Sequence, residues 1–169
     1  MKNNCIIVDI DNTFLQYNHS EVPFPDTISR ADWDLFHKKM LFYTPEIFTI
    51  NKDVVELITN NAKKNIIIFI TAREDTLDGL IRKNTLRSIS EAFNLYVEDV
   101  ILFMRPEGNF DKDFLVKQEI LTQHIKPYYN VKMAFDDNVE NIKMFQENNI
   151  LGLQVFLPKE KKNVHYTQD

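Results

Sequence analysis

The sequence predicts an α/β fold, Rossmann-like, built on a doubly wound parallel sheet of about five strands. Short apolar runs rich in β-branched residues alternate along the chain with amphipathic stretches of helical period. Runs of this kind are typical of strands that are buried on both faces of a parallel sheet. The chain has 169 residues, of which 44% are hydrophobic and 27% are charged. This size and composition fit one globular domain, so we expect a single domain over residues 1–169.

The expected strands and helices follow each other in a regular order. Strands are expected at the apolar runs, which are residues 5–8, 66–70, 100–104, 131–135 and 153–156. Helices are expected between them, at the apolar patterns within residues 54–58, 80–93, 114–125 and 142–145. Asn51 is a suitable N-cap for the first of these helices. Pro127 ends the third, because proline cannot continue a helix.

Residues 15–49 interrupt this alternation. They contain three prolines and a short helical pattern that includes Trp33 and Phe36. We expect a small helical insertion (a cap) after the first strand, lying over the carboxyl end of the sheet. Packing of the insertion on the body of the domain would explain the aromatic residues equally well.

Polar residues follow four of the expected strands. They lie at residues 9–13, 71–73, 105 and 136–138. Because the carboxyl ends of parallel strands meet at one edge of a sheet, where ligands bind, these residues are expected to converge. Any one of these groups alone would be explained as an ordinary turn or helix cap. Four coincident polar strand ends, carrying four carboxylates, favour a functional site.

The residue types at this edge indicate phosphate chemistry. Close carboxylates repel each other, and Mg²⁺, which prefers oxygen ligands and pairs with phosphate, resolves the conflict. The sequence has no Cys or His cluster for zinc. Asp9 can attack phosphorus as a nucleophile, and Asp11 can protonate the leaving group and then activate water. Thr71, Arg73 and Lys117 can hold the phosphoryl oxygens.

Asp113 lies four residues before Lys117 on one face of the third expected helix. Residues at this spacing are neighbours on a helix, so the carboxylate can orient the lysine. Taken alone, the spacing is better explained by a solvent-exposed pair, which would contribute only about a few tenths of a kcal/mol.

These residues resemble the four motifs of the haloacid dehalogenase (HAD) superfamily. The matching positions are residues 9–13, Thr71, Lys117, Asp136 and Asp137, each in the expected strand or helix context. The resemblance covers residues 5 to about 156. It implies a HAD fold with a cap at about 15–49 and a Mg²⁺-dependent phosphatase, because the second acid, Asp11, is found in the phosphatase branch.

A closer similarity lies in residues 104–117, where an arginine, a glycine and an Asp-x-x-x-Lys pattern recur. This segment resembles the 3′-phosphatase domain of phage polynucleotide kinase and its stand-alone phage relatives. Residues 32–36, Asp-Trp-Asp-Leu-Phe, also resemble the insertion of those proteins.

The similarity implies roles for individual residues. Arg73 and Arg105 would contact the scissile phosphate, Asp113 would position Lys117, and Thr13 would support the loop after the first strand. The Mg²⁺ ligands would be the carbonyl of Asp11 and the side chains of Asp9 and Asp137, with Asp136 adjacent.

The substrate is left open between two phosphatase activities. One is removal of 3′-phosphate from polynucleotide ends or nucleotides, and the other is hydrolysis of 5′-(deoxy)nucleotides or another small phosphoester. The related polynucleotide phosphatases carry an arginine soon after the first motif, and residues 16–20 contain none. A third hypothesis is a binding protein that kept the HAD fold without catalysis.

The composition restricts the other partners. A net charge of -5 argues against a protein whose main task is to grip a nucleic-acid backbone, although an enzyme that touches only a strand end remains compatible. No apolar stretch of membrane-spanning length and no signal peptide are found. We expect a cytoplasmic protein, in the host cytoplasm if a phage encodes it, with no membrane contact and no obligatory protein partner.

Overall fold

The computed structural model describes residues 2–17, 48–76 and 78–156. Its main sheet has five strands, and every neighbouring pair runs parallel. From one edge to the other the strands are β5 (Ile101–Pro106), β4 (Ile66–Asp75), β1 (Asn3–Val8), β6 (Tyr129–Asp136) and β7 (Leu151–Gln154). The first strand of the chain is therefore central, which confirms the predicted doubly wound fold.

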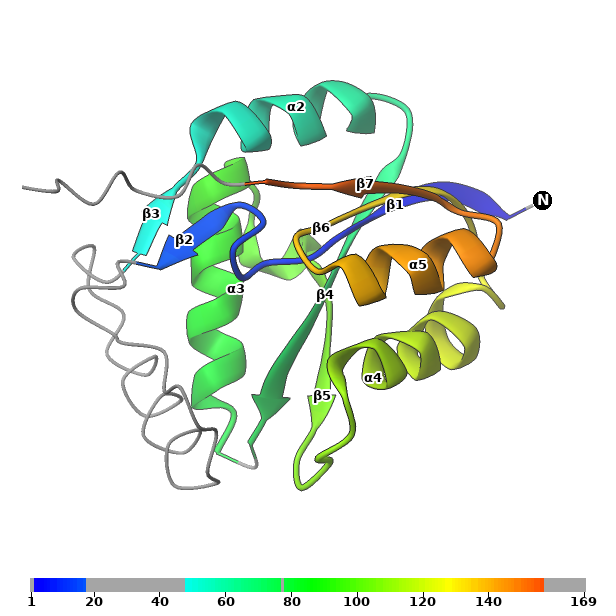
Figure 1. Cartoon of the computed structure of the whole chain (residues 1–169). Coiled ribbons are helices and arrows are strands. Elements are labelled where there is room, and N and C mark those ends of the chain that lie inside the picture. Colours follow the sequence, from blue (N-terminus) through cyan, green and yellow to red (C-terminus); the bar gives the residue numbers. More distant parts are fainter. Residues whose placement is uncertain (1, 18–47, 77, 157–169) are drawn as a thin grey trace, which may run out of the picture.

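Helices cover both faces of this sheet (Figure 1). On one face lie α2 (Lys52–Ala62) and α3 (Leu80–Phe93), followed by a 3₁₀ turn at Val97–Asp99. On the other face lie α4 (Asp113–Ile120), which continues into a π-helical turn at Leu121–Ile125, and α5 (Val139–Glu147). The helices connect successive strands and pack back onto the faces of the sheet, as the alternating sequence pattern requires.

Side chains of the central strand alternate between two hydrophobic cores. Ile6 and Val8 pack with residues of α2 and α3, whereas Cys5 and Ile7 pack with residues of α4 and α5. This alternation follows from the two-residue period of a strand. Both sets are fully buried, so β1 is rigidly held and its last residues are placed at a fixed point of the sheet edge.

Several element boundaries differ by a few residues from the sequence analysis. Strands β1 and β6 begin two residues earlier, and β5 ends two residues later, than predicted. Strand β4 continues to Asp75, past the predicted end at residue 70, and its register against β5 shifts between Thr71 and Glu74. Strand β7 begins two residues earlier than predicted, at Leu151. The third predicted helix is regular only to Ile120. Asn51 caps α2 as expected, with its side chain accepting a hydrogen bond from the amide of Val54 at 3.2 Å.

A short antiparallel pair stands at the base of the predicted insertion. Strand β2 (Leu15–Tyr17) pairs with β3 (Phe48–Ile50), so the described residues on the two sides of this segment lie next to each other. The predicted helical pattern with Trp33 and Phe36 lies outside the described residues, and the cap therefore stays a prediction. No helix within the described ranges is long and apolar enough to cross a membrane.

Candidate active site

Asp9 is the first residue after β1, and its carboxylate is held at both oxygens. Its amide donates to the carbonyl of Phe135 on the neighbouring strand at 2.9 Å, which fixes the backbone. Lys117 Nζ contacts Oδ1 at 2.6 Å, and the hydroxyl of Thr13 donates to Oδ2 at 2.8 Å. The aspartate is only 4% exposed. These contacts leave the carboxylate one orientation at the edge of the sheet.

The loop after Asp9 turns back sharply enough to bring Thr13 to it. Asn12 adopts the left-handed conformation with φ 57°, a region that asparagine tolerates better than most residues. Its amide donates to the carbonyl of Leu15 at 2.8 Å, which closes the turn. Thr13 is fully buried. Its hydroxyl ties this loop to Asp9, and the loop-supporting role that the resemblance implies stays a prediction.

Asp136, the last residue of β6, is completely buried and engaged at both oxygens. Lys117 Nζ contacts Oδ2 at 2.8 Å. Oδ1 accepts from the backbone amide of Asn138 and from the side chain of Asn141, each at 2.9 Å. The sequence analysis missed Asn141. A polar residue directly before Ile142, on the apolar face of α5, was the signal that could have identified it.

Burial and like charge perturb the pKa values of these groups. Burial, followed by the nearby carboxylates, raises the pKa of Asp9 well above its usual range, although Lys117 opposes this effect. Burial and Asp136 raise the pKa of Asp137 to about 6. For Lys117, burial lowers the pKa, but Asp136 and Asp9 outweigh it and raise the pKa above its ordinary value. The lysine is therefore a permanent cation between two carboxylates.

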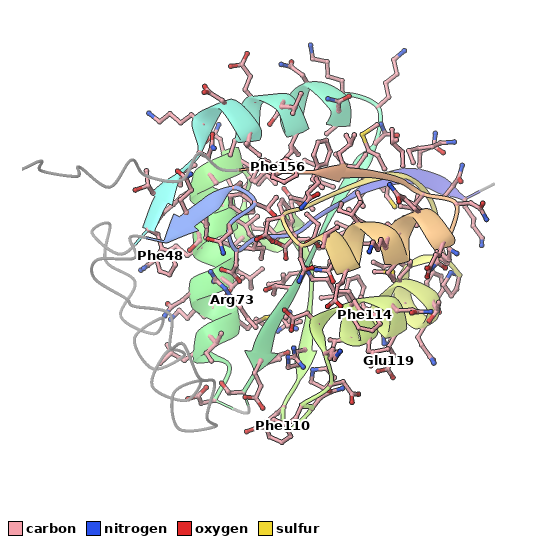
Figure 2. All side chains as sticks on the ribbon, in the orientation of Figure 1. Phe48, Arg73, Phe110, Phe114, Glu119 and Phe156 are labelled. Carbon is pink, nitrogen blue, oxygen red and sulfur yellow. The ribbon has the colours of Figure 1, made fainter. Side chains whose placement is uncertain are left out.

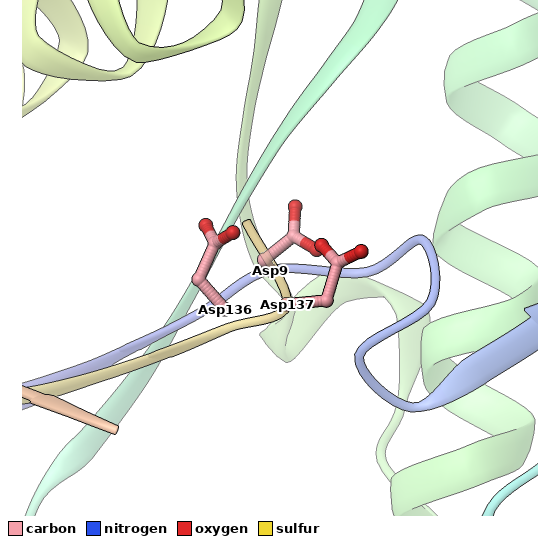
Figure 3. A group of neighbouring side chains, drawn as sticks. All are labelled: Asp9, Asp136 and Asp137. Carbon is pink, nitrogen blue, oxygen red and sulfur yellow. The ribbon is translucent and has the colours of Figure 1, made fainter. Parts of the chain in front are cut away.

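Three carboxylates at this edge fit a divalent cation (Figure 3). Asp9, Asp136 and Asp137 each offer an oxygen, and these oxygens all lie within 4.8 Å of one another. Among the described residues, Lys117 is the one ammonium in contact with them, so this group keeps a formal excess of two negative charges. An all-oxygen donor set of this charge suits Mg²⁺. Burial first, and then the Asp136 carboxylate, raises the pKa of Asp137 to about 6, so a bound cation would favour its ionised form.

Asp11 lies beside Arg73 and Thr71 of β4. Arg73 Nε and Nη2 donate to the Asp11 carboxylate at 2.9 and 2.5 Å, which makes the ion pair bidentate. The hydroxyl of Thr71 contacts Asp11 at 3.3 Å and accepts from the Arg73 amide at 3.1 Å. The structure thus brings together the three residues that sequence analysis had assigned to the acid and to the phosphate.

The guanidinium of Arg73 has two further neighbours that sequence analysis missed. Nη1 donates to the hydroxyl of Thr85 on α3 at 3.0 Å. The ring of Phe48 on β3 lies with its centroid 5.8 Å from Cζ, and Figure 2 places the two side chains together beside α3. Thr85 and Phe48 occur in an ordinary helix and in the return of the insertion, so nothing in the local sequence marked them.

Arg105 and Asp113 form a separate cluster. Arg105 Nε donates to the carbonyl of Ala72 at 2.8 Å, Nη1 donates to the carbonyl of Asp111 at 2.6 Å, and Nη2 contacts Asp113 at 2.6 Å. The guanidinium of Arg105 thus joins three parts of the chain: Nε contacts β4, Nη1 contacts the loop between β5 and α4, and Nη2 contacts the first residue of α4. Arg105 thus anchors this loop, and its expected contact with the scissile phosphate stays a prediction. Asp113 pairs with Arg105, whereas Lys117 contacts Asp9 and Asp136.

A family model and solved structures match this chain. The model of the polynucleotide kinase PNKP phosphatase domain, HAD_PNKP, matches residues 3–158. A chain in a solved structure of the Pnkp1/Rnl/Hen1 complex is 22% identical with a TM-score of 0.65, and the match covers 91% of this chain and 46% of that chain. A chain of the Pnkp1/Rnl/Hen1 RNA repair complex is 20% identical, also with a TM-score of 0.65, over 91% of this chain and 42% of that one.

A further match is a HAD family enzyme from Bacteroides thetaiotaomicron, solved with magnesium and inorganic phosphate. It is 13% identical with a TM-score of 0.51, and the match covers 96% of this chain and 98% of that chain. At these identities the structures show a common fold. This chain spans less than half of the Pnkp1 complex chains that it matches. Because the family match covers residues 3–158 of 169, the chain belongs to the PNKP phosphatase-domain family of the HAD superfamily and is a HAD-type phosphatase.

Proposed function

We propose that this phosphatase is a Mg²⁺-dependent phosphomonoester hydrolase that works through an aspartyl-phosphate on Asp9 and removes 3′-phosphate from polynucleotide ends or nucleotides. The observation that carries the mechanism is the environment of Asp9. It is a buried carboxylate at a strand end, oriented by Lys117 and Thr13, with a second carboxylate, Asp11, two residues away. A nucleophile and an acid placed around one reaction centre are what hydrolysis of an alkyl phosphate requires.

The reaction proceeds in two displacements. A carboxylate oxygen of Asp9 bonds to phosphorus, the ester P–O bond breaks, and the departing oxygen takes its electron pair together with a proton from Asp11. A water then attacks the phosphorus of the aspartyl-phosphate and gives its proton to Asp11, and Asp9 leaves as a carboxylate. Lys117 and Thr71 stabilise the negative charge on the phosphoryl oxygens. Arg73, whose Nε and Nη2 donate to Asp11 and whose Nη1 donates to Thr85, orients the acid.

The carboxylate contacts support a division of roles between the two adjacent aspartates. Both oxygens of Asp136 are engaged by Lys117, Asn138 and Asn141, which suits a residue that positions the lysine. Asp137 is half-buried beside Asp9. We assign Mg²⁺ to the side chains of Asp9 and Asp137 and to the carbonyl of Asp11. When bound, the ion neutralises the carboxylates and polarises the phosphoryl oxygens.

Metal binding can be tested without turnover. A ligand that binds only the folded state at 100 times its Kd stabilises it by about 2.7 kcal/mol. Mg²⁺ should therefore raise the thermal midpoint of the wild type, and Asp137→Asn should remove most of this response. An equal response in both proteins would exclude Asp137 as a ligand.

The family match supports the 3′-phosphate substrate, because the matching model describes the phosphatase domain of a polynucleotide kinase. One sequence feature favours the second candidate, a 5′-(deoxy)nucleotidase. Residues 16–20 lack the arginine that the related polynucleotide phosphatases carry after the first motif. A phosphatase without this cation would hold a long, negatively charged strand less firmly and would depend more on the terminal phosphate itself.

Phosphate release separates these candidates. The substrates are a 3′-phosphorylated oligonucleotide, a 3′-dNMP, a 5′-dNMP and p-nitrophenyl phosphate, each with Mg²⁺ and with EDTA. We expect the highest kcat/KM on the 3′-phosphates and no turnover with EDTA. Preference for the 5′-dNMP would replace the proposed substrate with the second candidate. No release from any substrate, with Asp9→Asn indistinguishable from wild type, would refute the proposed activity.

A further inference from the structure

The guanidinium of Arg73 is enclosed by groups from three different elements. Its Nε and Nη2 edge pairs with Asp11 in the loop after β1. Its Nη1 donates to Thr85 on α3 at 3.0 Å, and the ring of Phe48 on β3 lies 5.8 Å from Cζ. The side chain of Arg73 is only 6% exposed. A planar group bound at two edges and approached by a ring has little freedom to rotate or to slide.

We propose that Thr85 is a positioning residue for the phosphatase reaction, acting through Arg73 on the general acid Asp11. The inference rests on the proposed function, in which Asp11 protonates the leaving oxygen. Asp11 belongs to a loop, whereas Thr85 belongs to a helix whose residues Ile81 and Ile89 are packed into the core. The hydroxyl of Thr85 thus locates Arg73, and with it Asp11, relative to the rigid scaffold.

The burial of Thr85 strengthens the argument. The residue is 0% exposed on the face of α3 that packs on β4, a place where an apolar residue of the same shape would fit. A buried hydroxyl without a hydrogen-bond partner lowers the free energy of unfolding. The partner here is a cation, and a hydrogen bond to a charged group is stronger than one between neutral groups. The hydroxyl therefore supplies an interaction that valine could not.

Two substitutions of Thr85 separate shape from hydrogen bonding. Thr85→Val keeps the volume and removes the acceptor, and Thr85→Ser keeps the hydroxyl. A matched control is Ser88→Ala. Ser88 lies on the same helix and is 1% exposed, but its hydroxyl donates to the carbonyl of Asn84 within the helix. Ser88→Ala therefore disturbs the buried face of α3 without touching Arg73.

The kinetic readout is the dependence on the leaving group. An alkyl leaving oxygen needs the proton of Asp11, whereas the nitrophenolate of p-nitrophenyl phosphate needs it little. Thr85→Val should lower kcat for an alkyl ester, such as a 3′-dNMP, by about 10- to 100-fold, the equivalent of one hydrogen bond to a charged group. It should lower kcat for p-nitrophenyl phosphate by less than about threefold. Thr85→Ser and Ser88→Ala should behave like the wild type on both esters.

A second readout does not require activity. In the protein without substrate, the Nε–H proton of Arg73 is protected by its hydrogen bond to Asp11. NMR can follow the exchange of this proton with water. The signal is assigned by its absence in Arg73→Lys. Thr85→Val should accelerate this exchange by about tenfold or more, because losing one hydrogen bond to a charged group weakens the protection by about this factor. Thr85→Ser should leave the exchange rate unchanged.

Equal losses on the two esters, or unchanged kinetics together with unchanged exchange in Thr85→Val, would overturn the inference. If the wild type hydrolyses no monoester, the proposed function fails. The exchange measurement still decides by itself whether Thr85 controls the pairing of Arg73 with Asp11. The failure of one proposal can therefore be told from the failure of the other.

Discussion

Two charged residues of α4, Asp113 and Lys117, lie four residues apart and have opposite environments. The side chain of Lys117 is 3% exposed and lies between the carboxylates of Asp9 and Asp136. The side chain of Asp113 is 46% exposed and pairs with Arg105. Helical spacing alone predicts that the two would pair with each other. Instead, Lys117 contacts the ends of β1 and β6, whereas Asp113 contacts Arg105 near the end of β5.

The difference shows how burial decides the importance of a charge. Around Lys117 the charges are removed from water, so their mutual interactions are strong and an unpaired member is costly. The Asp113 side chain is 46% exposed and its partner Arg105 is 12% exposed, so water reaches the pair from the Asp113 side and screens it, and such pairs contribute about 0–1 kcal/mol. The comparison predicts large effects for substitutions in the buried cluster and small effects in the exposed one.

The largest effect is expected for Asp9→Asn. The amide cannot form the aspartyl-phosphate, so kcat should fall by at least about 10⁴-fold, as for the loss of other nucleophiles. Folding should be retained, because the substitution removes one of several repelling carboxylates. Phosphate release and circular dichroism measure the two effects. Asp53→Asn, at an exposed position of α2, is the control, and substantial turnover by Asp9→Asn would exclude Asp9 as the nucleophile.

Asp11→Asn tests the proposed general acid, whose side chain is 24% exposed and lies next to the buried cluster in the sequence. General acid catalysis contributes about 10²- to 10⁴-fold, and we expect a loss of this size on an alkyl ester. The loss on an aryl ester should be much smaller, because that leaving group needs little protonation. The ratio of the two kcat values is the measurement, and it cancels any change in the amount of folded protein. The same loss on both esters would argue that Asp11 only holds Arg73.

Lys117→Met should reduce both activity and stability. Removing a charge that stabilises the transferring phosphoryl group costs about 10²- to 10³-fold in kcat. It also leaves Asp9 and Asp136 buried without their cation, which should lower the free energy of unfolding by about 3–5 kcal/mol. Urea denaturation measures this loss, with Lys143→Met as the exposed control on α5. Stability equal to that of the control would mean that the ion pairs of Lys117 with Asp9 and Asp136 contribute no more to the free energy of unfolding than an exposed pair does.

The sheet and its helices could be predicted because the apolar pattern reports directly which faces are buried. The left-handed turn at Asn12 also fits the sequence, because asparagine adopts this backbone conformation more readily than most residues. The partners of Arg105 and Asp113 could not be predicted in this way. They depend on the path of the loop between β5 and α4, and on carbonyl groups, which carry no sequence signal. Thr85 was missed because its partner is twelve residues away on another element.

Asp113→Asn is the smallest and most discriminating change. It removes the charge that pairs with Arg105, while Arg105 keeps its hydrogen bonds to the carbonyls of Ala72 and Asp111. The free energy of unfolding should change by less than about 1 kcal/mol, as for other exposed pairs. Because Lys117 keeps both of its own carboxylates, kcat/KM should fall by less than about tenfold. A loss as large as that of Lys117→Met would mean that Asp113 positions the lysine during the reaction, so this one variant decides whether the two charged residues of α4 act separately.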